Sequence, residues 1–465
     1  MRRAEPPSKN MSTNSPHSAD EAHTESTPSP ADTLLQQAMQ SHRDGEIEKA
    51  RKLYQQVLTL DADHVDGLHL FGLLHAQAGD DARAEQLIAR AIELKPTEAM
   101  FHNNMGNLAM VAERLDDAQT HYQRAYALAP DRLDVVNNIA LLQGRRGDLE
   151  ASEQTFLKLI EAAPGFSDAR QNLANLYFRD GRVALAVEQC AKGLVTAPRS
   201  RALRRLLGVA YGTLGFNEQA IALYRKWHAE EPDHPEPLHH LAGLTGEGVP
   251  DRASDDYVRA TFNNFAKSFD AKLAELGYQA PALTAQAVTE VLGTPQGTLR
   301  VVDAGCGTGL CAPFLAPYAA LLVGVDLSGP MLENAARRGQ YHELVESDLT
   351  LFLDSRPASF DLMVSADTLC YFGKLDRFAE VAFASLCAGG WLVFTVEAWT
   401  DPPDDTAGSS PGYRLRSHGR YSHREDYVRQ TLLSVGFLPP QLDAVVLRQE
   451  GGEPVHGWLV RTSVA

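Results

Sequence analysis

A 34-residue repeat between residues 31 and 234 constrains this chain more than any other feature of its sequence. Prolines recur at this spacing, and a small residue stands twelve positions before each of them. The prolines are Pro96, Pro130, Pro164, Pro198 and Pro232, and the small residues are Ala84, Ala118, Ser152, Ala186 and Ala220, with Ala50 one period earlier. A fixed period of this length predicts stacked supersecondary units rather than one compact core.

Two further series share the same period. Glycines stand at Gly45, Gly79, Gly147, Gly181 and Gly215, with Glu113 as the one departure, and other small residues stand at Ala38, Gly72, Gly106, Ala140, Ala174 and Gly208. A small residue within a helix lets a neighbouring helix approach, a glycine makes the tight turn between helices, and a proline ends the second helix. Each repeat is therefore predicted to be a helix–turn–helix unit.

This pattern resembles the tetratricopeptide repeat (TPR). Six repeats would cover 31–64, 65–98, 99–132, 133–166, 167–200 and 201–234, and residues 235–244 resemble the helix that caps such arrays. In this family the first helices line a concave face that holds peptides. Asn104, Asn138 and Asn172 recur on that helix, and their amides offer both a donor and an acceptor to a peptide backbone. Hydrogen bonding between repeats is the alternative role for these asparagines.

The second half of the chain alternates between short apolar segments and helical patterns. Residues 299–303, 321–326, 361–365 and 390–397 are predicted to be buried parallel strands, with helices near 310–317, 329–338 and 375–386. This order predicts an open α/β sheet with ligands at the carboxyl ends of its strands. Segments 441–449 and 454–462 flank Glu-Gly-Gly-Glu, which indicates a β-hairpin.

The first predicted strand runs into a glycine loop and then a helix, with the sequence VVDAGCGTG over residues 301–309. Such glycines let the backbone touch a ligand and leave amides free for a negative group. The G-x-G-x-G spacing lacks the third glycine of the dinucleotide fingerprint, but Asp326, 21 residues after Gly305, stands where a ribose-binding carboxylate is expected.

These motifs together resemble motifs I and II of the class I S-adenosylmethionine-dependent methyltransferases, and bacterial TPR-containing methyltransferases in particular. The resemblance implies a cofactor site whose methionine part is held by Asp303, Gly305, Gly307 and Gly309. It implies that Asp326 holds the ribose and that Leu327 packs on the adenine. Asp348 and Leu349 would lie at the adenine amino group, and Ala366 would lie near the sulfonium. Aromatic residues at 262, 265 and 269 share one helical face, which either covers the cofactor or packs on the sheet.

The predicted fold is therefore an all-α TPR superhelix followed by a Rossmann-like α/β domain, whose seven-stranded sheet ends in an antiparallel hairpin. We expect a disordered tail over 1–30, the array and its cap over 31–246, a linker over 247–256 and the methyltransferase domain over 257–465.

Candidates for removing a proton from the methyl acceptor are few: Asp367 and Tyr371 after the fourth strand, and His418 and His423 after the fifth, of which His423 is the leading one. His423 lies in a segment rich in Gly, Ser and Arg after the fifth strand, where a histidine that structures the loop is the alternative, and Asp367 can equally be structural.

Composition excludes other classes. The 43 basic and 60 acidic residues give a net charge of −17, which argues against nucleic-acid binding. No apolar stretch is long enough to span a membrane, and five scattered cysteines without paired spacing predict neither a metal site nor disulfides. We expect a cytoplasmic protein.

The leading hypothesis is a methyltransferase whose array recruits a protein substrate or partner. A small-molecule methyltransferase with an array used only for assembly is the alternative, and a non-catalytic scaffold with a vestigial methyltransferase fold is a third. The methyl acceptor stays open at this point.

Overall fold

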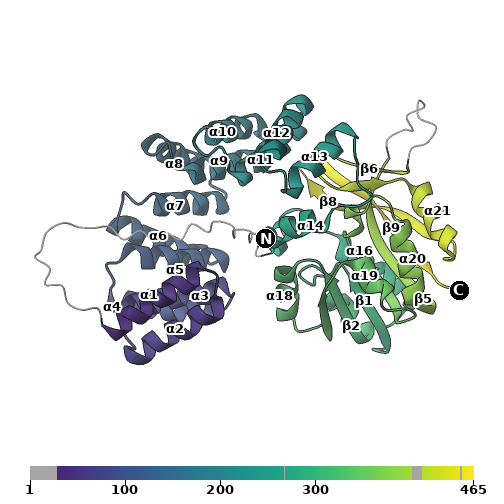
Figure 1. Ribbon diagram of the computed structural model, residues 1–465, viewed down its shortest axis with the longest axis horizontal. Helices are drawn as coiled ribbons and strands as arrows, with labels where there is room; N and C mark the ends of the chain where they lie inside the picture. Colours follow the sequence, from purple (N-terminus) through teal and green to yellow (C-terminus); the bar gives the residue numbers. More distant parts are fainter. Residues whose placement is uncertain (1–28, 267, 401–410, 451–452) are drawn as a thin grey trace, which may run out of the picture. The chain divides into compact units, whose positions relative to one another are not determined.

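The computed structural model describes residues 29–266, 268–400, 411–450 and 453–465 (Figure 1). The chain divides into two compact units, one up to Leu206 and one from Leu207 to Ala465, so the division falls inside a helix of the last repeat. The domain boundaries given above from the sequence remain predictions. The predicted disordered tail lies outside the described residues, except for Ser29 and Pro30.

The repeats form successive helix pairs, and from the third pair onward each begins 34 residues after the one before it. The helices are α1 (Pro30–Arg43), α2 (Ile47–Leu60), α3 (Val65–Gln77), α4 (Asp81–Leu94), α5 (Ala99–Val111), α6 (Leu115–Leu128), α7 (Leu133–Arg145), α8 (Leu149–Ala162), α9 (Ser167–Arg179), α10 (Val183–Thr196), α11 (Arg201–Thr213) and α12 (Asn217–Glu230), followed by α13 (Pro235–Thr245). This is the predicted TPR arrangement with its additional final helix.

The turn within each pair uses a left-handed backbone. Gly45, Gly79, Gly147, Gly181 and Gly215 have φ between 73° and 84°. Glu113 occupies the corresponding position in the third repeat and takes the same conformation, with φ of 56°. Residues with a side chain disfavour this left-handed conformation. The third repeat therefore forms the same turn at a cost in conformational free energy.

The series of small residues marks where the two helices of a pair touch. A Cβ added at Gly106 would lie 2.5 Å from the ring of Tyr122, and one at Gly72 would lie 2.7 Å from Ile88. Both partner side chains, Tyr122 and Ile88, are fully or almost fully buried. The small residue is thus a packing requirement of the helix pair.

The second unit contains a mixed sheet. Its strands are β1 (Leu299–Ala304), β2 (Ala319–Asp326), β3 (Glu343–Glu346), β4 (Phe360–Ser365), β5 (Leu386–Ala398), β6 (Tyr413–Leu415), β7 (Tyr421–His423), β8 (Gln441–Glu450) and β9 (Glu453–Ser463). Strands β3, β2, β1, β4 and β5 are parallel in that order, and the predicted hairpin β8–β9 pairs antiparallel with β5. Strands β6 and β7, which the sequence pattern did not predict, add a small ribbon at the last two residues of β5.

Helices cover both faces of this sheet. The helices of this unit after α13 are α14 (Asp255–Phe265), α15 (Phe269–Glu275), α16 (Ala280–Leu292), α17 (Ala312–Leu315), α18 (Gly329–Arg337), α19 (Leu349–Asp354), α20 (Asp376–Ser385) and α21 (Glu425–Val435), with the short 3-10 turns η1 (Ala316–Tyr318) and η2 (Leu369–Tyr371). Val301 packs in the core with α16 and α17, whereas its neighbour Val302 packs with α19, α20 and α21. Burial on alternate faces explains the continuous apolar strands.

Among the described residues, the structure has no helix with the length and hydropathy needed to cross a membrane.

Candidate cofactor and acceptor site

The glycine loop after β1 is fixed to the end of β2 by backbone hydrogen bonds. The amides of Gly305 and Cys306 each donate to the carbonyl of Val325 at 2.9 Å. The amide of Gly307 donates to Oδ2 of Asp326, also at 2.9 Å, and the Ser328 amide donates to Oδ1 at the same distance. The structure therefore brings the predicted loop and the predicted ribose carboxylate into direct contact.

Burial sets the proton affinity of the carboxyl groups in this region. Asp303 is 1% exposed, and burial raises its pKa to about 7, although the Tyr341 hydroxyl donates a hydrogen bond to it. Burial also raises the pKa of Asp326, and the amides of Ser328 and Gly307 partly offset that rise. Asp303 thus lies beneath the loop rather than on its surface.

Gly305 is required by a close contact with the end of β4. It has φ of 80°, and an added Cβ would lie 2.1 Å from Oγ1 of Thr368. That hydroxyl donates to the carbonyl of Gly305 at 3.2 Å. The residue after Asp367 therefore touches the glycine loop, which joins the cofactor loop to the segment that follows β4.

Asp348, which follows β3, caps α19 through one carboxylate oxygen and pairs with Arg252 through the other. Its Oδ1 accepts a hydrogen bond from the Leu351 amide at 2.9 Å. Its Oδ2 is buried and accepts no hydrogen bond among the described residues, although Nη2 of Arg252 lies 3.3 Å away. A buried acceptor in this state suits a ligand that carries an N–H group.

The predicted cofactor residues follow four neighbouring strands, β3, β2, β1 and β4, at their carboxyl ends. Leu327 and Ala366 are partly exposed there, and Leu349 is 6% exposed.

The segment before the sheet lies against this edge. Its aromatic residues were predicted on one helix, but the structure divides them between α14 and α15. Asp270 accepts a hydrogen bond from the Thr308 hydroxyl at 2.5 Å, and Asn263 accepts one from Ser328 at 2.7 Å. Phe262 contacts Tyr371 edge to face, with ring centroids 5.3 Å apart. These contacts join the segment to the glycine loop, to the residues after β2 and to η2.

His423 is a residue of the core, and the base role considered for it is not supported. It is 0% exposed, its Nε2 donates to the carbonyl of Gly373 at 3.0 Å, and its ring stacks on Tyr427. Burial lowers its pKa to about 4, so the ring is neutral. The segment forms β7, whose three residues are all buried, and His423 therefore has the loop-structuring role weighed as the alternative.

Asp367 instead belongs to a buried ionic network. Nη1 of Arg448 donates to its Oδ2 at 2.5 Å, and the same guanidinium donates to Glu397 and, through Nε at 2.7 Å, to Glu450. Arg420 donates to Glu397 at 2.5 Å and to Glu450 at 2.6 Å. Three carboxylates thus share two guanidinium groups.

One oxygen of Asp367 lies outside this network. Its Oδ1 is buried and accepts no hydrogen bond among the described residues. The backbone of Asp367 is also left-handed, with φ of 57°, and its amide donates to the Thr395 hydroxyl. Strain and an unused buried acceptor are features of a functional position.

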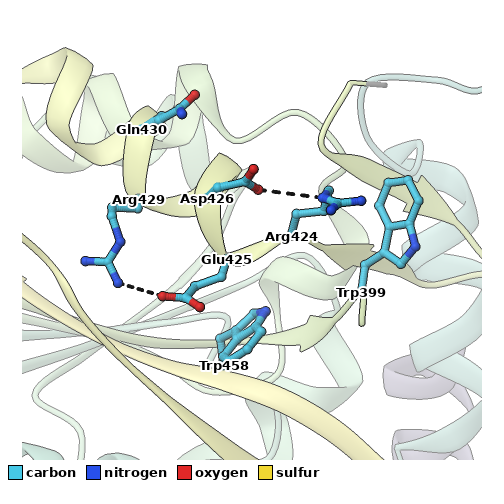
Figure 2. A pocket seen from close by; sticks show the side chains of 7 residues that line it. All are labelled: Trp399, Arg424, Glu425, Asp426, Arg429, Gln430 and Trp458. Carbon is cyan, nitrogen blue, oxygen red and sulfur yellow. Dashed lines mark hydrogen bonds and ion pairs between the residues drawn. The ribbon is translucent and has the colours of Figure 1, made fainter. Parts of the chain in front are cut away.

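A cavity of about 390 Å³ lies on another part of this unit (Figure 2). Its lining includes two indole rings and the first turn of α21, namely Trp399, Trp458, Arg424, Glu425, Asp426, Arg429 and Gln430. Arg429 pairs with Glu425 at 2.7 Å, and the Arg424 guanidinium lies over the Trp399 ring. No predicted cofactor residue lines this cavity.

In the first unit, the repeated asparagines bond to one another between successive repeats. Asn138 Nδ2 donates to Asn103 Oδ1, and Asn172 Nδ2 donates to Asn137 Oδ1, each at 2.9 Å. Asn104 Nδ2 lies 2.8 Å from His69 Nε2. Each pair is 35 residues apart. The inter-repeat role weighed for these amides is therefore present, and a peptide would have to use their remaining donors and acceptors.

The fold and the glycine loop define a class I methyltransferase domain, preceded in the chain by TPRs. Residues 302–394 match the family described as a methyltransferase domain, and residues 43–99, 103–166 and 138–199 match a TPR family.

Two curated methyltransferases are similar to parts of the second unit. The chain is 38% identical to human methyltransferase-like protein 27 over 98 residues, which are 21% of this chain and 39% of that protein. It is 28% identical to trans-aconitate 2-methyltransferase of Pseudomonas aeruginosa over 178 residues, which are 34% and 64% of the two chains. Both matches span less than two thirds of the relative.

The repeats have relatives of their own. The chain is 24% identical to the TPR-containing protein trd-1 of Caenorhabditis elegans over 139 residues, 30% of this chain and 17% of that protein. The solved structure of PilW, a type IV pilus biogenesis factor, covers 46% of this chain and 98% of its own, with 18% identity and a TM-score of 0.41.

No group of three His, Cys, Asp or Glu side chains within the described ranges is arranged to hold a metal ion.

Proposed function

We propose that the second unit binds S-adenosylmethionine at the carboxyl ends of β3, β2, β1 and β4 and transfers its methyl group. The observation that carries this proposal is the contact between the Gly307 amide and Asp326, because it presents the loop backbone and a ribose acceptor on one surface. Each Asp326 oxygen accepts one backbone N–H in the structure and has capacity for a further donor.

The neighbouring residues fit the rest of this cofactor. Oδ2 of Asp348, which pairs with Arg252 but accepts no hydrogen bond among the described residues, would accept one from the adenine amino group, and Leu327 would pack on the ring. Asp270 and Asn263 would hold α15 and α14 over the loop and exclude water from it. When bound, the cofactor supplies an electrophilic methyl group on a sulfonium.

We assign the acceptor side to the segment after β4. Asp367 would accept a hydrogen bond from an N–H or O–H acceptor through Oδ1 and take its proton as the methyl carbon bonds to that atom and leaves the sulfur. Burial raises the pKa of Asp367, although Arg448 opposes the rise, and a higher pKa suits a proton acceptor. Tyr371 lies beside it in η2 and contributes to the wall of the site.

The array would recruit a protein that is the substrate or that carries it. TPRs generally bind other proteins, and Asn138 and Asn172 are partly exposed, so both amides can contact a peptide while they bond to the neighbouring repeat.

The test is transfer of label from methyl-tritiated S-adenosylmethionine into a cell lysate by the full chain, with Asp326→Ala, at a low cofactor concentration, as the control with weakened cofactor binding. Label in protein supports the leading proposal. Label only in small molecules supports the alternative in which the array serves assembly. Cofactor binding without any transfer supports the scaffold.

A further inference from the structure

The last helix of the repeat region, α13, makes specific contacts with the turn between β6 and β7. Two consecutive histidines on α13 provide them. His239 Nε2 donates to the carbonyl of Gly419 at 2.8 Å, and His240 Nδ1 donates to the carbonyl of Ser417 at 3.0 Å. Each ring is 5% exposed, and burial lowers the pKa of His239 to about 4, so its ring is neutral. All these residues belong to the second compact unit.

The helix and the turn also approach each other closely. A Cβ added at Gly243 on α13 would lie 2.6 Å from the carbonyl oxygen of Arg416, a backbone atom that cannot rotate away. On the other side of the turn, Gly419 has φ of 89°, and an added Cβ would lie 2.4 Å from the Tyr257 hydroxyl. The path of the turn is therefore set by α13 and α14 together.

The turn over residues 416–420 ends at Arg420, which belongs to the ionic network around Glu397. Arg420 follows Gly419 directly and donates to Glu397 and Glu450, which Arg448 links to Asp367. Glu397 is 4% exposed and Arg448 is 3% exposed. Burial would raise the pKa of Glu397, but Arg420 and the other nearby cations lower it to about 2, so it stays ionised.

A displaced Arg420 leaves this network with one guanidinium for the buried Glu397 and the partly exposed Asp367 and Glu450. A buried carboxylate that loses a cationic partner is costly, so the groups around Glu397 rearrange. Arg448 is the remaining cation, and Asp367 is the member of the network adjacent to the glycine loop, through Thr368.

We propose that α13 is a positioning element of the methyl-acceptor site: His239 and His240 hold the 416–420 turn, and Arg420 within that turn holds the network that orients Asp367. This inference rests on the proposed function, since it assigns Asp367 to the acceptor side. It makes the end of the TPR region part of the catalytic unit, so a partner bound at the last repeat contacts an element that sets turnover.

The experiment uses the full chain and compares His239→Ala with His239→Gln. The amide nitrogen of glutamine takes the place of Nε2 and retains a donor to Gly419. We expect the alanine variant to transfer methyl label at least about tenfold more slowly and the glutamine variant to recover to within about threefold of wild type. The affinity for S-adenosylhomocysteine, measured by calorimetry, stays unchanged in both variants.

Hydrogen–deuterium exchange gives a readout that needs no acceptor. In His239→Ala we expect faster exchange in peptides that cover 416–423 and also in those that cover 365–372, because the network connects them.

Two glycine substitutions separate the contact from general helix effects. Gly243→Ala should reproduce the exchange changes, whereas Gly212→Ala on α11 is the matched control, because its Cβ would meet Ser417 at an ordinary 3.7 Å.

The proposal is overturned if exchange rises at 416–423 but not at 365–372, or if His239→Ala transfers label as fast as wild type. Failure of the wild type to bind S-adenosylhomocysteine would instead reject the proposed function, while the exchange result would still decide whether α13 positions the network.

Discussion

The hydroxyl of Tyr341 donates a 2.6 Å hydrogen bond to Oδ2 of Asp303, and so the segment before β3 is tied to the buried end of β1. Burial raises the pKa of Asp303 from 3.8 to about 7 in the folded protein. A raised pKa means that folding favours the protonated carboxyl. Its contribution to the free energy of unfolding is complete below about pH 4 and is lost as the pH rises through about 7.

We therefore predict that the free energy of unfolding falls from pH 5 to pH 8 more steeply in the wild type than in Asp303→Asn, which cannot ionise. Urea unfolding of both proteins at about four pH values in this range measures the difference. Tyr341→Phe should move the wild-type transition to higher pH, because its hydroxyl lowers the pKa of Asp303. Equal pH slopes in wild type and Asp303→Asn would show that this carboxyl does not titrate in the range.

Asp326→Ala should weaken binding of S-adenosylhomocysteine by about 1–3 kcal/mol, because ribose hydroxyls lose their acceptor. Isothermal titration calorimetry measures this change. Asp361→Asn is the matched control: this carboxylate lies on β4 of the same sheet, pairs with Arg300 at 2.9 Å and is not among the predicted cofactor residues. Equal affinity in Asp326→Ala and wild type would place the ribose elsewhere.

The asparagine series gives a prediction for the array. Asn138→Ala combined with Asn172→Ala removes three inter-repeat hydrogen bonds and the amides proposed to contact a peptide. We expect loss of methyl transfer to protein with an unchanged affinity for S-adenosylhomocysteine. Methyl transfer at the wild-type rate would reject the peptide groove, and circular dichroism checks that the helices persist.

Gly106→Ala should lower the free energy of unfolding of the array by about 1–3 kcal/mol, because a methyl group cannot fit against Tyr122. Chemical denaturation of the full chain, followed by circular dichroism, measures this loss. Gly165→Ala has open space around its Cβ and should differ from wild type by less than about 0.5 kcal/mol. A neutral Gly106→Ala would mean that Tyr122 moves aside without cost.

The sequence predicted those features that depend on local pattern. The 34-residue period predicted the helix pairs, and the glycine series predicted the turn within each pair, a turn that the third repeat also forms although Glu113 replaces the glycine. The loop after β1 and Asp326 were predicted together because a strand, a glycine loop and the next strand end are close in sequence.

The sequence could not predict contacts that depend on pairing between distant segments. Arg448 and Glu397 are 51 residues apart and read as ordinary surface charges until β8 and β5 come together through β9. His423 looked functional because its segment is rich in Gly, Ser and Arg, which hid the short strand that buries it. No signal in the sequence marked His239 and His240 as donors to a turn about 180 residues later.

The hydrogen bonds between side chains 35 residues apart, which join successive repeats, have a consequence for how such a chain can change by gene duplication. Because equivalent hydrogen bonds join the second repeat to the third, the third to the fourth and the fourth to the fifth, one repeat gained or lost within α3–α10 leaves an equivalent set behind. The contacts of α13 with the 416–420 turn have no such equivalent, since they pair one particular helix with one particular loop. The array can therefore vary in length between its second and fifth repeats, while its last helix must be inherited together with the methyltransferase domain.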